Sequence, residues 1–132
     1  MKPFLFIADV LTFENDQTRI LNVPSDAGDK ASLLAWYVSA LDLPKHFGLN
    51  WDALDECLRD LSWLTEHKLI LYHKELPLKT STVDQTIYLE LLANAVCDWK
   101  PDEDHELVAA FDPTCELRIH SLLKRGGCKP AC

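Results

Sequence analysis

The chain has 132 residues and 48% of them are apolar, which is enough to bury a hydrophobic core in one domain without disulfides or metals. Its net charge of −8 disfavours nucleic acid as a partner, because proteins that bind nucleic acid normally present a basic surface. No apolar stretch approaches membrane-spanning length and the start lacks a signal-peptide pattern, so we expect a cytoplasmic protein with no membrane partner.

The negative charge is concentrated in one part of the chain. Residues 1–112 hold 9 basic and 20 acidic side chains, a net of −11, whereas the remainder holds 4 basic and 1 acidic. A basic protein is the natural counterpart of such a surface, since opposed fields steer the encounter of two molecules. Ordinary solubility is the other interpretation, because a negative charge suffices for it.

Two strands and a helix are predicted first along the chain. Residues 4–10 form an apolar run suited to a buried strand, and residues 18–23 form a second one with alternating character. The turn-like residues 14–16 between them predict an N-terminal hairpin. Asp29 can then cap a helix over residues 30–41.

A loop that leads into an acidic helix follows, and it is the most informative stretch. Pro and Gly mark residues 44–48 as loop, and Asn50 is a good N-cap for a helix that begins near Trp51. Helical spacing places four apolar residues on the inner face, namely Leu54, Cys57, Leu58 and Leu61. The opposite face carries Asp52, Asp55, Glu56, Arg59 and Asp60.

Two interpretations of this acidic face stay open at this point. Acids in a first helical turn interact favourably with the macrodipole, and most charged stripes are solvated faces. The loop, however, brings His46, Phe47 and Trp51 next to the carboxylates. Aromatic surface beside charge resembles the anchored centre of a protein interface.

The second half of the chain predicts a strand, a long helix and another strand. Residues 68–72 are the clearest strand, and the pattern Thr82-x-x-Gln85 is a capping box for a buried helix that runs to about Trp99. Residues 107–111 are short, apolar and strand-like. This order predicts a right-handed parallel crossover, and hence an α/β fold with a small, mainly parallel sheet of three or four strands packed with helices.

The end of the chain is less clearly patterned. Residues 117–123 fit an extra strand or a helix equally well, and residues 124–132 suggest a flexible tail. We expect a domain over residues 1–112 and a partly flexible C-terminal extension over residues 113–132. Trp63 is an interface anchor if the acidic helix reaches it, and packs under the sheet if the helix ends earlier.

The cysteines do not suggest a disulfide framework, because there are five of them. Cys57 and Cys97 fall on apolar helical faces and are interpreted as small buried hydrophobes. His120, Cys128 and Cys132 are near one another in sequence, but a fourth zinc ligand is not evident. We therefore expect neither a metal nor a cofactor.

An enzyme is the other class to consider. His46 with Asp52 or Glu56 offers an acid–base pair for a hydrolase. No nucleophile elbow, phosphate-binding glycine loop or metal motif completes such a site. We therefore predict a protein that is not an enzyme.

The acidic stretch resembles the barstar family of ribonuclease inhibitors. The resemblance rests on Leu-Pro, two ring-bearing residues, and Gly-x-Asn-x-Asp-Ala-Leu-x-acid-Cys-Leu. These are here Leu43, Pro44, His46, Phe47, Gly48, Asn50, Asp52, Ala53, Leu54, Glu56, Cys57 and Leu58. Outside this stretch the order of elements agrees from about residue 1 to residue 112. The resemblance implies the family's α/β fold and the inhibition of a basic ribonuclease, whose active site an acidic loop and helix would block.

The resemblance also assigns roles to residues. Asp52 and Glu56 match the acidic positions that enter the enzyme's groove, and His46 matches an aromatic contact residue. The loop residues that match those lying against the enzyme are Gly48, Asn50 and Trp51. The full predicted partner-binding surface is His46, Phe47, Gly48, Asn50, Trp51, Asp52, Asp55, Glu56, Arg59 and Asp60.

Departures from the family pattern fall on the same surface. Asp55 stands where the family's best-known member has a Trp, Glu56 where it has an Asp, and His46 where it has a Tyr. Asn94 stands near the position of a Glu on the later helix. These differences favour a different partner, and the alternative functions are a module that binds another basic protein or an immunity protein against a toxin that is not a ribonuclease.

Overall fold

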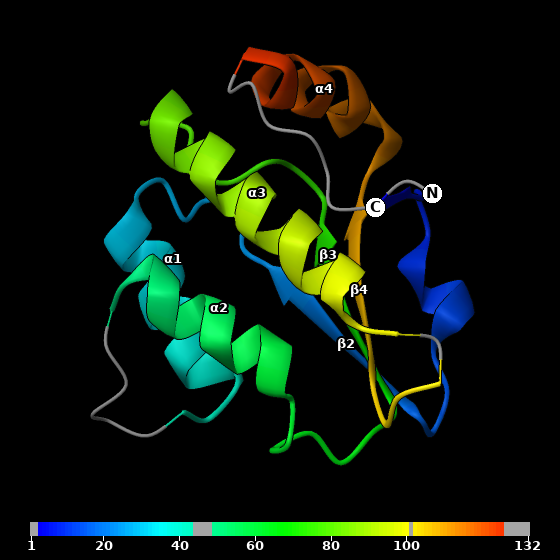
Figure 1. The fold of residues 1–132 in the computed structure, drawn as a ribbon. Coiled ribbons are helices and arrows are strands. Elements are labelled where there is room, and N and C mark those ends of the chain that lie inside the picture. Colours follow the sequence, from blue (N-terminus) through cyan, green and yellow to red (C-terminus); the bar gives the residue numbers. More distant parts are fainter. Residues whose placement is uncertain (1–2, 44–48, 101, 126–132) are drawn as a thin grey trace.

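A computed structural model of the chain describes residues 3–43, 49–100 and 102–125, and its framework is a parallel sheet (Figure 1). The strands are β1 (Phe4–Phe6), β2 (Thr18–Val23), β3 (Lys68–His73) and β4 (Glu106–Phe111). They lie in the order β1-β4-β3-β2, and every neighbouring pair is parallel. The predicted α/β fold with a small parallel sheet is confirmed.

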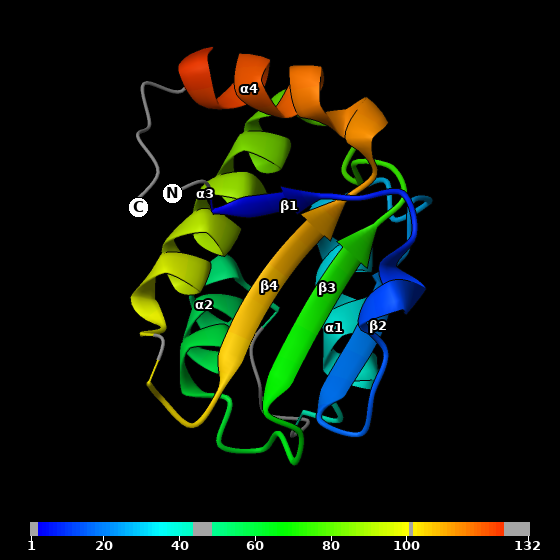
Figure 2. The same ribbon diagram turned by 90° about the vertical axis from the view of Figure 1, so that its right-hand side faces the viewer.

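Helices α1 (Lys30–Ala40), α2 (Trp51–Asp60) and α3 (Thr82–Asp98) lie between strands along the chain, and α4 (Glu116–Arg125) follows the last strand. The short 3-10 turns are η1 (Val10–Phe13) and η2 (Pro113–Cys115). Figure 2 shows α1, α2 and α3 behind the sheet and η1 in front of it. Parallel strands need such crossover helices, which is why β3 and β4 are joined by the whole of α3.

The core is divided between the two faces of the sheet. Alternate residues of β3 point to opposite sides, so Leu69 and Leu71 join the large cluster under the helices. Ile70 and Tyr72 join a smaller cluster with Val10 on the other face. A strand buried on both faces has a continuous apolar run, and this explains why β3 is the clearest strand in the sequence.

The predicted N-terminal hairpin is wrong. β1 ends at Phe6 and pairs in parallel with β4, while β2 lies at the far edge of the sheet beside β3. Asp9 accepts a hydrogen bond from the Leu11 N–H and so caps η1, whose Val10 is buried against the sheet. The end of the predicted first strand is therefore a turn that carries the chain across the sheet.

The predicted caps are right for two helices and displaced for the third. Asp29 accepts a hydrogen bond from the Ser32 N–H at the start of α1. The cap of α3 is Ser81, which accepts from the Asp84 N–H, so the predicted box from Thr82 to Gln85 is wrong by one residue.

Gln85 is buried and serves tertiary structure instead of a capping box. Its amide nitrogen donates to the Pro77 carbonyl at 3.0 Å, and its amide oxygen accepts from Arg118 at 3.3 Å. The second contact joins α3 to α4.

Residues 117–123, whose pattern fits either a strand or a helix, belong to α4. Ile119 and Leu122 are spaced by three and are buried in the main core. The predicted flexible tail lies, from residue 126 on, outside the described residues.

A chain of buried hydrogen bonds ties α1, α3 and the sheet together. The Tyr37 and Tyr88 hydroxyls are 2.6 Å apart, and the Tyr88 hydroxyl is 2.7 Å from His73 Nε2. His73 Nδ1 lies 2.9 Å from the Ala110 carbonyl, which can only accept, so Nδ1 carries the proton and Nε2 accepts from Tyr88. Tyr88 in turn accepts from Tyr37.

This arrangement keeps His73 neutral. The side chain is fully buried and stacks on Phe111 with ring centroids 4.1 Å apart. Burial lowers its pKa from 6.5 to about 4, although the hydrogen bond to Ala110 acts in the opposite direction. A protonated ring would also lose its ability to accept from Tyr88.

We predict that the free energy of unfolding falls by about 2 kcal/mol between pH 7.5 and 5 because of His73 alone. The unfolded chain takes up this proton near pH 6.5, whereas the folded protein does so only near pH 4. The contribution of His73 to stability is therefore fully present above pH 6.5 and is lost as the pH falls towards 4. Urea unfolding at several pH values measures it.

The control is the His73→Gln variant. Between pH 7.5 and 5 its free energy of unfolding should change much less than that of the parent protein, whatever its stability at pH 7.5. Should that variant fail to fold, NMR of the His73 ring in the unmodified protein decides. A ring that titrates near pH 6.5 in the folded state contradicts the prediction.

Candidate protein-binding surface

Helix α2 is fixed at both ends and along its inner face. Asn50 Oδ1 accepts a hydrogen bond from the Ala53 N–H at 2.8 Å, which confirms the predicted N-cap. Leu54 and Leu58 are fully buried. The helix ends at Leu61, whose backbone adopts a left-handed conformation with φ of 48°.

The left-handed conformation of Leu61 is unusual for a side chain with a Cβ. It costs roughly 1–2 kcal/mol. The side chain is fully buried, however, and full burial of a Leu contributes roughly 1.5–3 kcal/mol. Packing therefore outweighs backbone preference at the point where α2 must turn back towards β3.

The outer face of α2 carries carboxylates in two different states. Asp52 and Glu56 are exposed, and among the residues that the structure describes they make no hydrogen bond or ion pair. They are one turn apart on the same side of the helix, about 6 Å along its axis. Asp60 is also exposed and accepts a hydrogen bond from the Ser62 hydroxyl at 2.6 Å.

Arg59 occupies the other side of this face. Its Nε lies 3.0 Å from Asp55 Oδ1, and its Nη1 lies 3.1 Å from Asp98 Oδ2 at the end of α3. Partial burial alone would lower the pKa of Arg59, but its hydrogen bonds and ion pairs with the two carboxylates raise it. Asp55 and Arg59 are thus engaged within the protein.

Trp51 lies at the edge of this surface. It is half-buried at the first position of α2, with its ring 6.0 Å from that of Tyr88. The Lys30 ammonium is 5.7 Å from the centre of the Trp51 ring, which is a cation–π distance. Much of this ring therefore packs inward, above the buried Tyr37–Tyr88–His73 chain.

Comparison with known families gives a match over most of the chain. The family model described as "Barstar (barnase inhibitor)" matches residues 20–112. The chain belongs to the barstar family. No curated protein and no solved structure matches it significantly.

The barstar match takes in most of β2 and all of α1, α2, β3, α3 and β4, and so includes the whole acidic helix. Of the predicted partner-binding residues, the structure brings Asn50, Trp51, Asp52, Asp55, Glu56, Arg59 and Asp60 together on or beside α2. His46, Phe47 and Gly48 lie outside the described residues.

The contacts around the end of α2 were only partly evident from the sequence of this barstar-family chain. Trp63 lies beyond the end of the helix and packs against the main core, so the inward of its two interpretations is confirmed. Trp99 donates its indole N–H to the Leu58 carbonyl at 2.9 Å. This bond and the Asp98–Arg59 pair fasten the end of α3 to α2, and because both join distant segments, no local pattern indicates them.

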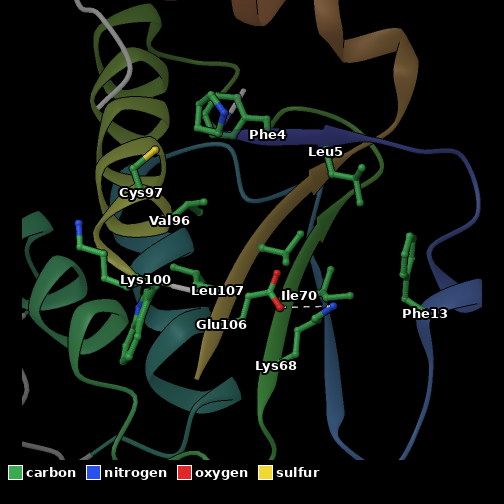
Figure 3. A pocket seen from close by; sticks show the side chains of 13 residues that line it. Phe4, Leu5, Phe13, Lys68, Ile70, Val96, Cys97, Lys100, Glu106 and Leu107 are labelled. Atoms are coloured by element: carbon green, nitrogen blue, oxygen red, sulfur yellow. Dashed lines mark ion pairs between the residues drawn. The ribbon is translucent and has the colours of Figure 1, made fainter. Parts of the chain in front are cut away.

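A pocket in the described part of the chain is separate from the acidic surface (Figure 3). It has a volume of about 520 Å³ and lies beside β4, beneath the short strand β1. Its walls are mainly apolar, and its floor carries the Lys68–Glu106 ion pair at 3.5 Å. None of the α2 carboxylates lines it.

The cysteines and the possible metal site differ from the sequence interpretation in one respect. Cys57 is a buried free thiol as predicted, whereas Cys97 is only half-buried and is disulfide-bonded, so it is not a simple buried hydrophobe. Within residues 3–43, 49–100 and 102–125, no three His, Cys, Asp or Glu side chains are grouped so as to hold a metal ion. Cys128 and Cys132 lie outside those ranges.

No helix in the described part of the chain combines the length and the apolar character that a bilayer span requires.

We predict that Asn50→Ala lowers the free energy of unfolding by about 1 kcal/mol, because the Ala53 N–H then loses its acceptor. Asn50→Ser is the matched control and should retain most of the stability, since a Ser hydroxyl can accept the same bond. Urea unfolding at pH 7.5 compares the three proteins. Equal stability of the Ala variant and the parent would show that Asn50 does not cap α2.

Proposed function

We propose that this protein inhibits a basic ribonuclease by covering its active site with α2 and the loop before it. The observation that carries the proposal is the pair Asp52 and Glu56, two exposed carboxylates without partners among the described residues, on a helix whose inner face is buried. Membership of a family described as barnase inhibitors supports the same role, and it supports binding rather than catalysis.

The chemistry follows from what a ribonuclease groove must hold. Such a groove binds phosphates with Arg, Lys and His, and carboxylates can take the place of those phosphates in charge-assisted hydrogen bonds. A helix fixed by Asn50 at one end and by Leu61 and Trp99 at the other presents them with little loss of conformational freedom. We expect the inhibitor to act in the cytoplasm, where RNA would need protection.

The predicted binding surface is not uniform. Asp52, Glu56 and Asp60 face outward, and we propose that they meet the partner together with Asn50 and the edge of Trp51. His46, Phe47 and Gly48 belong to this proposal on the family resemblance alone.

We predict that Asp52→Asn and Glu56→Gln each weaken binding to the partner by about 3–5 kcal/mol, because each leaves a cation of the enzyme buried and unpaired. The free energy of unfolding should change by less than about 1 kcal/mol, since an exposed helical carboxylate contributes little. A partner captured from the source cell, assayed for RNA cleavage, provides the binding measurement.

Asp16→Asn controls for the loss of one negative charge away from α2, because Asp16 is exposed in the turn between η1 and β2. The on-rate of the unmodified pair should fall as salt rises, while the off-rate changes less. Equal losses of stability and binding in the α2 variants would instead make the two carboxylates structural.

A second candidate, an inhibitor whose target is another basic protein, is favoured by the contacts of Asp55. This residue replaces an aromatic of the family's best-known member and is paired with Arg59. Asn94 on α3 likewise offers no charge where that member has a Glu. We propose that the scaffold is kept while the target differs.

We therefore predict that the protein does not inhibit barnase with sub-nanomolar affinity. Such an affinity corresponds to roughly −12 kcal/mol, which leaves little room for mismatched charges at the centre of the interface. Glu56 also extends its carboxylate by about one methylene, which disturbs paired hydrogen bonds in a preorganised groove. An inhibition assay on barnase decides, and sub-nanomolar inhibition would falsify the idea.

A further inference from the structure

We infer that Arg59 divides the acidic surface into closed and open carboxylates and thereby sets which partner fits, an inference that rests on the proposed function. Asp55 and Asp98 are closed, because Arg59 already binds them both. Asp52 and Glu56 have no partner among the described residues and are open, and Asp60, one turn further on, is exposed and accepts a hydrogen bond from the Ser62 hydroxyl. The partner that fits presents two cations to the open pair and, beside them, an acceptor such as a carboxylate or a backbone carbonyl to Arg59.

The guanidinium lies between two helices and is only partly used. Nε binds Asp55 at 3.0 Å within α2, and Nη1 binds Asp98 at 3.1 Å on α3. A guanidinium carries five N–H donors, and the Arg59 side chain is 34% exposed, so it can also donate to an acceptor on a second molecule.

Contact with Arg59 makes the two closed carboxylates less attractive to a second cation. A cation that approached Asp55 would have to displace Nε, and it would meet the positive charge of Arg59 while doing so. The contact of Arg59 with Asp98 lies where α3 is joined to α2, because the neighbouring residue Trp99 donates a hydrogen bond to the Leu58 carbonyl. Arg59 is therefore positioned by both helices.

The charges also direct the partner to the open pair. The closed group carries two carboxylates and one guanidinium, a net of −1, whereas Asp52 and Glu56 together carry −2. The attractive field is strongest over the open pair, and a groove that is basic throughout places one of its cations against Arg59. Arg59 thus excludes partners whose basic surface extends across the whole face.

Barnase is the probe for this inference, measured by association kinetics at low salt and by inhibition of RNA cleavage. Asp52→Asn and Glu56→Gln should each lower the affinity at least tenfold, and Asp55→Asn and Asp98→Asn less than threefold. Arg59→Gln should raise the affinity at least threefold, mainly through the on-rate. Lys124→Gln removes the same charge from α4, which Figure 1 shows on the other side of α3 from α2, and should change the affinity less than twofold.

The decisive comparison is Asp55→Asn in the presence and absence of Arg59. In the Arg59→Gln background Asp55 is open, so Asp55→Asn should now lower the affinity about tenfold. A loss of the same size in both backgrounds, or a loss for Asp55→Asn as large as that for Asp52→Asn, overturns the inference.

A measurement without a partner separates this inference from the proposed function. Thermal unfolding of Arg59→Gln, Asp98→Asn and the double variant should be non-additive, because the two residues contact each other. If barnase binds neither the parent protein nor any variant, the proposed inhibition fails for this enzyme. If the effects of Arg59→Gln and Asp98→Asn on thermal stability are additive, Arg59 and Asp98 are not coupled, and the inference fails as well.

Discussion

The burial of one face of α2 is the constraint on which the rest of the acidic surface depends. Leu54, Leu58 and Leu61 have no exposed surface, so the helix cannot rotate about its axis without losing core contacts. Because residues one turn apart share a side of a helix, fixing the inner face also fixes the direction of every outer side chain. The caps at Asn50 and Leu61 then fix where the helix starts and stops. The inner side of these ten residues carries stability, and the outer side is the one proposed to carry recognition.

Beneath this helix, the core is polar at one place, and that polarity adds specificity to the packing. The chain from Tyr37 through Tyr88 to His73 joins α1, α3 and the end of β3, and each hydroxyl or ring nitrogen in it has a partner. Apolar contacts alone tolerate small shifts of one helix over another, whereas hydrogen bonds of 2.6 and 2.7 Å do not. Trp51 packs on Tyr88, so the start of α2 rests on the part of the core that is least free to shift.

The sequence predicted those features that local chemistry decides. Asn50 and Asp29 cap helices because their own oxygens reach N–H groups three residues on, and β3 is recognisable because it is apolar throughout. The predictions that failed concern features that depend on segments distant in the sequence. The partner of β1 was decided by η1, which carries the chain across the sheet, and an apolar run gives no sign of that path. The same holds within the site: the spacing of Asp55 and Arg59 is that of a helical ion pair, but the contribution of Asp98 depends on how α3 crosses α2.

This division between local and tertiary causes bears on how specificity can change within the family. The residues of α2 that resemble the family and face inward are constrained by the core, since a change at Leu54 or Leu58 would open a cavity costing roughly 2–5 kcal/mol. The departures at Asp55 and Glu56 lie on the outer side, where substitutions cost little stability. Asp55 adds a negative charge beside the others, and the structure shows Arg59 compensating it from one turn away. A partner that binds this surface as proposed must therefore accommodate the Arg59 cation as well as the Asp52 and Glu56 carboxylates, which a uniformly negative surface would not require.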